Sequence, residues 1–375
     1  MSDVASNGAG PSRVERLAGG LVGFGVEAMV VQSLVDVRYL TGFTGSSGLA
    51  LVAADGQRDT IGADRFLTDF RYVSQSAAQV PATLLREIVT GELLEAVPGL
   101  LQSGSGRLGF DDTQMTVREH RKLAEQVPGG WELVPCPNAV QTLRAVKDAQ
   151  EIAKIAAACK LADEALEAIL EDGLAGRTER EIASSLEQRM RDLGAEEASF
   201  SSIVASGAHG ALPHAEPRAE KVAKDVLVTI DWGARYDGYC SDCTRTFATG
   251  EGISDHAREV YELVLAAQEA GLAAVKAGPS GKDVDAAARE VIEAGGHGEH
   301  FGHGLGHGVG LEIHEGPRLS RMAPSDPLVV GNIVTIEPGV YLPGELGVRI
   351  EDLAVVREGS QDVLTRLSKA LTVVS

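Results

Sequence analysis

The stretch DVLVTIDWGARYDGYCSDCTRTF, residues 225–247, predicts two β-strands joined by a tight turn. Residues 225–234 form an apolar run that becomes polar at its end, which is typical of a buried strand. Asp237-Gly238 is a dipeptide that favours a two-residue hairpin loop. A loop of that length pairs Tyr236 with Tyr239, so the segment is predicted to be an antiparallel hairpin.

Two aspartates lie close together in this hairpin. The same register places Gly233 opposite Asp242, and Asp231 shares a face with Gly233 because side chains alternate along a strand. Asp231 and Asp242 are then diagonal neighbours, about 7–8 Å apart at the backbone. Two like charges repel each other there unless a cation lies between them, and we interpret Gly233 as the open space for that cation. A loop one residue longer would shift the pairing by one residue and place Asp231 and Asp242 on opposite faces of the hairpin.

The pattern of a strand ending in an acid recurs further along the chain. Residues 332–337 form a second apolar strand that ends at Glu337, and Pro343-Gly344 marks a reversal. Residues 348–351 then lead through Glu351 into another apolar strand. Two strand pairs that each contribute two carboxylates resemble a duplicated half-site.

The densest histidine region lies between the two strand pairs. Five of the nine histidines fall within residues 296–316: His297, His300, His303, His307 and His314. Glycine occupies every second position of residues 302–310, which we interpret as allowing the backbone to approach a metal or substrate closely. The run does not match a dinucleotide-binding loop in any register. His297 and His300 fit incidental members of a glycine-rich loop at least as well as functional residues.

Five residues are the candidate ligands of a two-metal centre: Asp231, Asp242, His307, Glu337 and Glu351. Four carboxylates and one imidazole suit a pair of hard or borderline divalent ions such as Mn²⁺, Co²⁺ or Zn²⁺. Two ions held in this way can bridge a water, convert it to a hydroxide near neutral pH and polarise a carbonyl oxygen. The pattern therefore predicts a dinuclear hydrolase.

These residues carry a resemblance to the M24 metallopeptidases, and in particular to the branch that cleaves Xaa-Pro bonds. The matching blocks follow in the expected order: Asp231–Ala234, Asp237–Phe247, His303–His307, Glu312–Glu315, Ile336–Gly339 and Arg349–Asp352. Ser206-Gly207 and Pro213–Pro217 resemble the upstream histidine block of that branch. The resemblance implies a pita-bread catalytic domain, a curved pseudo-symmetric sheet backed by helices.

The resemblance also implies roles for the site residues. The five candidate ligands match the metal ligands of the family, with Asp242 and Glu351 bridging the ions. Glu337 matches the carboxylate that also shuttles the proton from the bridging water. His214 and His314 match histidines that contact the substrate and stabilise the tetrahedral intermediate, and His303 matches a further pocket histidine. Tyr341 and Arg349 match residues near the site, and we assign them no defined role from the sequence.

The first half of the chain resembles the amino-terminal domain of the aminopeptidase P, prolidase and creatinase group. Residues 38–46 and 68–72 carry this looser match. We expect a disordered tail over residues 1–12, a creatinase-like α/β domain over 13–135 and the pita-bread domain over 136–375, an α/β (α+β) architecture. A helix is predicted at 152–169, where apolar residues recur at three- and four-residue steps. Further helices are predicted at 179–193, 256–276 and 282–293, and a helical stretch is predicted at 81–97.

Composition limits the classes of partner. The formal net charge is −20, from 34 basic and 54 acidic residues, which argues against binding to a nucleic-acid backbone. No apolar run approaches the length of a membrane span, and the start of the chain lacks the features of a secretory signal. Cysteine use suits a reducing compartment, since Cys136 and Cys159 have no evident partner. Cys240 and Cys243 form a C-x-x-C that zinc or redox sites also use, and packing beside Asp242 is the better interpretation. We therefore expect a cytoplasmic protein without nucleic-acid or membrane partners, and the resemblance implies a homodimer.

The leading function is hydrolysis of the bond between an N-terminal residue and a following proline, in short peptides, by a pair of metal ions with Mn²⁺ preferred. Both a dipeptidase and an aminopeptidase P remain open, with a slight preference for the dipeptidase. A methionine aminopeptidase is the second enzymatic alternative, and the creatinase-like first half argues against it. A pita-bread scaffold that binds partners without catalysis is the non-enzymatic alternative, and the complete ligand set argues against it.

Overall fold

The computed structural model describes residues 10–102 and 104–374. The chain divides into two compact units after Arg144. Most of the predicted N-terminal tail lies outside the described residues. The helix α6 (Ala139–Arg144), which the sequence assigned to the second domain, belongs to the first unit. Among the described residues, no helix is both long and apolar enough to cross a membrane.

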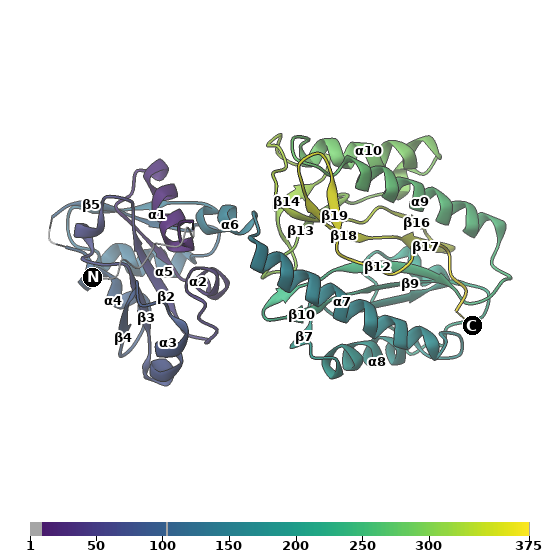
Figure 1. The fold of residues 1–375 in the computed structure, drawn as a ribbon, viewed down its shortest axis with the longest axis horizontal. Coiled ribbons are helices and arrows are strands. Elements are labelled where there is room, and N and C mark those ends of the chain that lie inside the picture. Colours follow the sequence, from purple (N-terminus) through teal and green to yellow (C-terminus); the bar gives the residue numbers. More distant parts are fainter. Residues whose placement is uncertain (1–9, 103, 375) are drawn as a thin grey trace, which may run out of the picture. The chain divides into compact units, whose positions relative to one another are not determined.

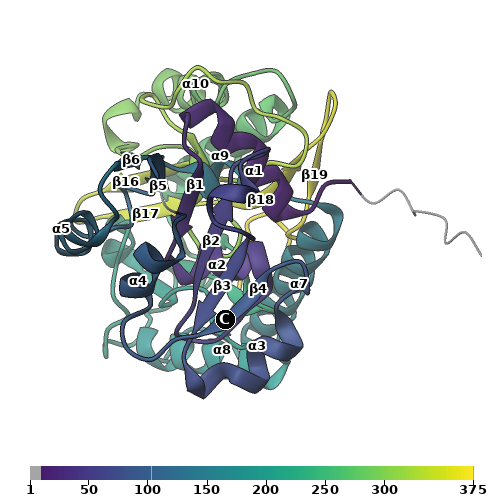
Figure 2. The ribbon, with the colours of Figure 1, turned by 90° about the vertical axis from the view of Figure 1, so that its left-hand side faces the viewer.

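The first unit is built on a mixed six-stranded sheet with the order β4-β3-β2-β1-β5-β6. Its strands are β1 (Ala28–Val31), β2 (Leu49–Ala53), β3 (Arg65–Thr68), β4 (Leu85–Ile88), β5 (Gly106–Phe110) and β6 (Trp131–Pro135). Its other helices are α1 (Arg13–Phe24), α2 (Leu34–Thr41), α3 (Val73–Gln79), α4 (Leu93–Ala96) and α5 (Val117–Gln126). Every residue of β1 and β2 is buried, because helices lie around the sheet (Figure 2).

The helical stretch predicted over residues 81–97 is wrong. The structure has a strand there, β4, followed by the single-turn helix α4. β4 pairs in parallel with β3, in a register that places Arg65 opposite Leu85. The pairing with β3 satisfies the backbone groups of this segment, and such tertiary pairing overrides a local helical pattern.

The second unit contains four long helices, all at the predicted positions. They are α7 (Ala149–Glu171), α8 (Glu179–Asp192), α9 (Asp255–Ala274) and α10 (Gly281–Ala294). Each begins at a residue whose side chain caps the helix: Asp148, Thr178, Ser254 and Ser280.

The strands of the second unit form two halves, each covered by one helix pair (Figure 1). In the first half, α7 and α8 pack on the sheet β12-β9-β8, next to the small sheet β11-β10-β7. In the second half, α9 and α10 pack on the sheet β14-β13-β15-β18-β19 and on the hairpin β16-β17. Buried Trp232 joins strand to helix in the first half, because its indole N–H donates to the carbonyl of Ala162 at 2.9 Å.

The strand bounds of this unit are as follows. The first half has β7 (Glu197–Ala198), β8 (Ile203–Ser206), β9 (Leu227–Trp232), β10 (Ala234–Tyr236), β11 (Tyr239–Cys240) and β12 (Cys243–Ala248). The second half has β13 (Gly306–Gly308), β14 (Glu315–Leu319), β15 (Ile333–Ile336), β16 (Gly339–Leu342), β17 (Leu346–Arg349), β18 (Asp352–Val356) and β19 (Gln361–Val363). Two 3₁₀ helices matter below, η4 (Gly207–Ala211) and η5 (Gly298–His300).

The predicted register of the first hairpin is confirmed. Tyr236 pairs with Tyr239, and further along Asp231 pairs with Thr244, so Asp242 lies diagonally opposite Asp231. The interpretation of Gly233 is wrong, however. A Cβ atom at Gly233 would lie 2.0 Å from the carbonyl oxygen of Ser241, so the glycine is required by close backbone approach and leaves no space for a cation.

The glycine-rich run around β13 has a similar explanation. A Cβ atom at Gly306 would lie 2.0 Å from the Thr335 carbonyl oxygen, and one at Gly308 would lie 2.1 Å from that of Gly316. These glycines let β13 fit between β14 and β15, whereas the sequence suggested approach to a metal or substrate. The glycines therefore position His307 indirectly, because they allow β13, which carries it, to pair closely with β14 and β15.

We predict that Gly306→Ala lowers the free energy of unfolding by about 1–3 kcal/mol, because the added methyl group forces β13 away from β15. Urea unfolding of the purified variant measures this. Gly302→Ala is the matched control, since a Cβ atom there meets nothing within 4 Å. Its effect should stay within about 0.5 kcal/mol. Equal effects of the two substitutions would contradict this explanation.

Candidate metal centre

The four candidate carboxylates lie at the ends of paired strands, where the two halves of the second unit meet. Asp231 is near the end of β9 and Asp242 directly precedes β12. Glu337 directly follows β15 and Glu351 directly precedes β18. In each half the two acidic positions are therefore set side by side by antiparallel pairing.

The five predicted ligands converge. Asp231, Asp242 and Glu351 each offer an oxygen, and these atoms lie within 4.8 Å of one another. The Nε2 atom of His307 lies 3.5 Å from an oxygen of Asp242 and 3.4 Å from an oxygen of Glu337. One imidazole and four carboxylates thus surround a common region.

Burial and neighbouring carboxylates shift the pKa of Asp242, Glu337 and Glu351 upward. Burial is the first cause of the raised pKa of Asp242, and the charges of Glu351, Asp231 and Glu337 add to it. The pKa of Glu351 is likewise raised by burial and by neighbouring carboxylates. Burial raises the pKa of Glu337 to about 7. Bound cations would reverse these shifts, because they stabilise the ionised form.

The hydrogen bonding of the site also fits a metal centre. Among the described residues, Oδ1 of Asp231 and Oε1 of Glu351 are buried oxygens without a hydrogen-bond donor. Buried oxygens of this kind normally have a partner, so each has a lone pair available to a cation. His307 donates Nδ1–H to the carbonyl of Gly308 at 3.0 Å, which leaves the lone pair of Nε2 for a ligand. The donor set suits Mn²⁺, Co²⁺ or Zn²⁺.

Buried Arg349 organises two of the carboxylates. Its Nη2 donates to Asp231 at 2.7 Å and its Nε donates to the hydroxyl of Thr244 at 3.1 Å. That hydroxyl in turn donates to Oε2 of Glu351 at 2.8 Å. From the sequence, no role was predicted for Arg349, and Thr244 was not among the predicted site residues. Strand alternation could have identified both, because each lies two residues from a carboxylate and so on its face.

Arg349 also begins a chain of hydrogen bonds to His303. Its Nη1 donates to the hydroxyl of Tyr341 at 3.0 Å, and Tyr341 donates to Nε2 of His303 at 2.9 Å. The Nδ1–H of His303 is bound to the carbonyl of Gly304 at 2.8 Å. Burial lowers the pKa of His303 to about 4, so its ring is neutral at pH 7. Both ring nitrogens of His303 are thus occupied within the protein.

The other two predicted histidines are exposed. The ring of His314 lies edge-on to that of His307, with centroids 4.4 Å apart. Burial is the first cause of the lowered pKa of His314, and the charges of His307 and His214 contribute. His214 also contributes to the low pKa of His303. His214 therefore lies near enough to both rings for its charge to act on them.

The segment that carries His214 is anchored by a single buried carboxylate, Glu179, at the start of α8. Its oxygens accept hydrogen bonds from the backbone and hydroxyl of Ser206, from the His209 ring at 2.9 Å and from the backbone and guanidinium of Arg218. These donors lie on both sides of His214 in the chain. The sequence analysis missed Glu179, because its partners come from two separate segments.

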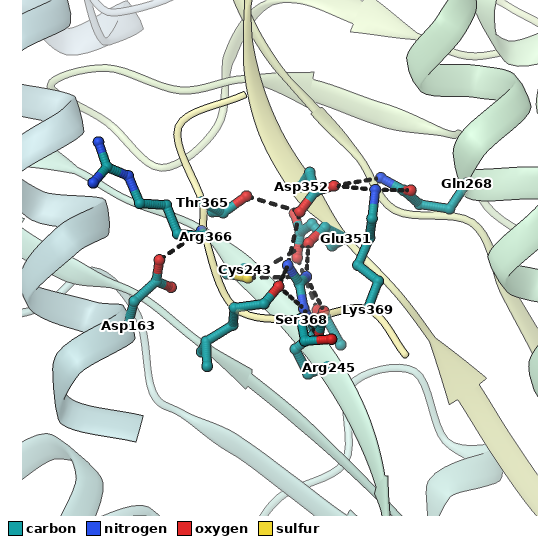
Figure 3. A network of polar contacts seen from close by, with 12 residues as sticks. Asp163, Cys243, Arg245, Gln268, Glu351, Asp352, Thr365, Arg366, Ser368 and Lys369 are labelled. Atoms are coloured by element: carbon teal, nitrogen blue, oxygen red, sulfur yellow. Dashed lines mark hydrogen bonds and ion pairs between the residues drawn. The ribbon is translucent and has the colours of Figure 1, made fainter. Parts of the chain in front are cut away.

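A second polar network lies on the opposite face of the strands that carry Asp242 and Glu351 (Figure 3). Buried Arg245 donates to the backbone carbonyl of Glu351 and, at 2.8 Å, to the carboxylate of Asp352. Asp352 also accepts from Gln268, Thr365 and Lys369. These hydrogen bonds connect α9 and the C-terminal segment to the ends of β12 and β18, next to Asp242 and Glu351.

The cysteines near the centre are packing residues. Cys240 and Cys243 are both buried free thiols. Burial raises the pKa of each thiol. Cys243 donates to the carbonyl of Glu351 at 3.4 Å, which adds to the contacts of the Arg245 network.

We predict that Arg245→Met lowers the free energy of unfolding of the chelator-treated protein by about 3 kcal/mol, because it leaves the buried Asp352 without its fully buried cationic partner. Lys369→Met is the matched control. Lys369 pairs with the same carboxylate but is 23% exposed, and its loss should cost about 1 kcal/mol or less. Urea unfolding of both variants decides the point. A larger effect at Lys369 would contradict the assigned importance of Arg245.

We predict that the Glu337 carboxyl group lowers the stability of the metal-stripped protein as pH rises between about 4.5 and about 7. The folded pKa of Glu337 is raised from 4.5 to about 7, so its contribution to stability is complete below the unfolded pKa and is lost as the pH passes the folded pKa. The loss should be roughly 3 kcal/mol. Unfolding of chelator-treated wild type and Glu337→Gln across this range measures the loss as the difference between their slopes, which cancels the opposite contribution of His303, whose folded pKa is lowered. Equal slopes in the two proteins would contradict the assignment.

The comparisons with known proteins agree with this geometry. Residues 153–358 match metallopeptidase family M24, and residues 13–146 match the creatinase/prolidase N-terminal domain. The chain is 34% identical to the Xaa-Pro dipeptidase of Pyrococcus furiosus, covering 96% of this chain and 99% of that protein. This match, like those below, extends over both units.

Two solved structures are also similar. The Xaa-Pro dipeptidase from Bacillus anthracis has a TM-score of 0.90 at 37% identity, covering 96% of this chain and 99% of the other. The X-Pro aminopeptidase from Thermotoga maritima has a TM-score of 0.84 at 34% identity, covering 95% and 99%. The predicted α/β fold class and family resemblance are thus confirmed. The chain belongs to metallopeptidase family M24, with a creatinase/prolidase N-terminal domain ahead of its catalytic domain.

Proposed function

We propose that this protein is an Xaa-Pro peptidase, which removes an N-terminal residue that precedes proline by means of two divalent metal ions. The observation that carries the proposal is the convergence of four carboxylates and one imidazole with two buried oxygens that lack donors. Relatives named Xaa-Pro dipeptidase and X-Pro aminopeptidase support the choice of substrate.

The proposed ligands are Asp231, Asp242, His307, Glu337 and Glu351, with Asp242 and Glu351 shared between the ions. Mn²⁺ is our preferred metal, and Co²⁺ and Zn²⁺ suit the same donors. When bound, the pair of ions would activate a water and polarise the scissile carbonyl. Arg349 and Thr244 would hold Asp231 and Glu351 in the required orientation through the hydrogen bonds described above.

Glu337 is the proposed proton shuttle. Burial raises its pKa to about 7 in the metal-free protein, and bound ions would lower that pKa, so the carboxylate would be ionised beside them. An ionised carboxylate at this position can accept the proton of the attacking water and then donate it to the leaving proline nitrogen. The hydroxyl of Thr335 donates to Glu337 at 3.1 Å and so orients its carboxylate.

Two of the predicted histidines are assigned to contact with the substrate, and the third is assigned to the positioning of a neighbouring side chain. His214 and His314 are exposed beside the centre, and we assign them to hydrogen bonds with the substrate and the developing oxyanion. His303 holds Tyr341 through a hydrogen bond of 2.9 Å, and we assign it to the orientation of that hydroxyl within the pocket. These assignments separate residues that touch the substrate from one that acts through a neighbour.

Several finer properties complete the proposal. We prefer a dipeptidase to an aminopeptidase P, and we expect a homodimer on the strength of the family. The four free, buried thiols support a cytoplasmic location. A methionine aminopeptidase is the alternative enzyme, and a creatinase/prolidase N-terminal domain favours Xaa-Pro substrates over it.

The substrate test compares Ala-Pro with Ala-Pro-Ala, using chelated protein before and after addition of Mn²⁺, Co²⁺ or Zn²⁺. We expect metal-restored hydrolysis of Ala-Pro. Cleavage of the dipeptide alone would identify a dipeptidase, and cleavage of the tripeptide an aminopeptidase P. Full activity of the chelated protein, or cleavage of Met-Ala with neither proline peptide cut, would refute the proposal.

We predict that Glu337→Gln lowers kcat for Ala-Pro by about 10²–10⁴-fold, because proton transfer is lost while the amide can still occupy the position. Metal content is measured on the same samples, which separates lost proton transfer from lost metal. Glu358→Gln, at an exposed position after β18, is the control and should leave kcat unchanged. An unaltered kcat in Glu337→Gln would contradict the assigned role.

A further inference from the structure

Three histidines and one glutamate gather at a place that the proposed metal centre does not use. His256 lies in the first turn of α9, His297 follows α10 and His300 ends η5. Glu345 lies in the turn between β16 and β17. The fold brings these segments together: the rings of His256 and His297 have centroids 6.4 Å apart, and Nε2 of His256 lies 3.8 Å from the carboxylate of Glu345.

The closest pair, His297 and His300, already has the spacing of two ligands on one ion. Their Nδ1 atoms are 3.2 Å apart. Two nitrogens bound to one tetrahedral Zn²⁺ at about 2.0–2.1 Å are separated by about 3.3–3.4 Å, which is nearly the same distance. In this structure the two Nδ1 atoms share a proton in a hydrogen bond, and an ion bound by both would replace that proton.

The backbone holds this pair in place. His300 lies three residues after His297 in a 3₁₀ turn, closed by a bond of 2.9 Å from the His300 amide to the His297 carbonyl. Side chains three residues apart in such a turn lie one above the other, so both rings project from the same side. The amide of His297 is fixed in turn to the carbonyl of Ile292 at the end of α10.

The charge state of the cluster also favours a cation other than the proton. Burial lowers the pKa of His297, and the charges of His300 and His256 lower it further. Neutral imidazoles carry the lone pairs that Zn²⁺, Cu²⁺ and Ni²⁺ bind. The carboxylate of Glu345, 3.8 Å from Nε2 of His256, would compensate the charge of an ion bound here.

We propose that His297 and His300 chelate a divalent transition-metal ion, with Zn²⁺ the best match, and that His256 and Glu345 complete its coordination. His256 is 48% exposed and Glu345 is 64% exposed, so both side chains are free to turn toward an ion held by the pair. Three imidazoles and a carboxylate form a donor set that suits Zn²⁺. This site is separate in its residues from the proposed catalytic centre, and it does not depend on the proposed function.

Such an ion would connect three segments that are distant in the sequence. It would tie the start of α9 and the end of α10 to the β16–β17 hairpin, whose strands carry Tyr341 and Arg349. The expected consequence is a stabilised turn between β16 and β17. The role is structural, and the reacting groups of the proposed catalytic centre are untouched.

The test counts the Zn²⁺ ions that remain bound after equilibrium dialysis of chelator-treated protein against Zn²⁺. We expect the double variant His297→Gln/His300→Gln to bind one ion fewer per chain than wild type. His256→Gln alone should retain the ion with weaker affinity. His120→Gln, which alters a histidine of the first unit, is the matched control and should leave the count unchanged.

Mn²⁺-dependent hydrolysis of Ala-Pro by the same variants provides the second readout. The double variant should keep wild-type activity, since neither residue belongs to the proposed catalytic centre. An unchanged Zn²⁺ count in the double variant would overturn the proposal even if the enzyme cleaves Ala-Pro. A lost ion in a protein without peptidase activity would support this site and refute the proposed function separately.

Discussion

The repulsion among four carboxylates buried together is the constraint on which the catalytic unit depends. Asp231, Asp242, Glu337 and Glu351 are held so close that neighbouring carboxylates add to the raised pKa of Asp242, Glu337 and Glu351, whose charge burial already disfavours. No such cluster would be favourable without compensation. The compensation comes from the guanidinium of Arg349 on one side and, in our proposal, from two metal ions between the oxygens.

The surrounding structure opposes this repulsion by immobilising the strand ends. Arg349 and Thr244 act on the face that carries the carboxylates. Arg245 and Asp352 act on the opposite face, where they draw in residues from α9 and from the C-terminal segment (Figure 3). Both faces of the same strands are therefore cross-linked by buried, charge-assisted hydrogen bonds, which keep the ligands in place while their charges repel.

The two halves of the unit share a construction but differ in what they add. Each supplies an antiparallel strand pair with two carboxylates and a helix pair that covers it. The first half adds the His214 segment, anchored on the buried carboxylate of Glu179. The second half adds the glycine-rich strand of His307, which fits between its neighbours because several of its residues have no side chain. The shared part holds the metal in our proposal, and the added parts face the substrate.

The sequence by itself determined the helices of the second unit and the hairpin register that places Asp231 near Asp242, because these follow from local periodicity, a two-residue turn and strand alternation. His307, Glu337 and Glu351 were predicted to join them from recurring motifs and the family resemblance. Only the tertiary structure decided the roles of Arg245, Arg349 and Glu179, whose partners come from distant segments. It also decided that residue 233 must be a glycine, because the Ser241 carbonyl leaves no room for a Cβ atom there. It decided as well that Leu85–Ile88 forms the strand β4. Both depend on backbone packing against another part of the chain, and no local pattern encodes which part that is.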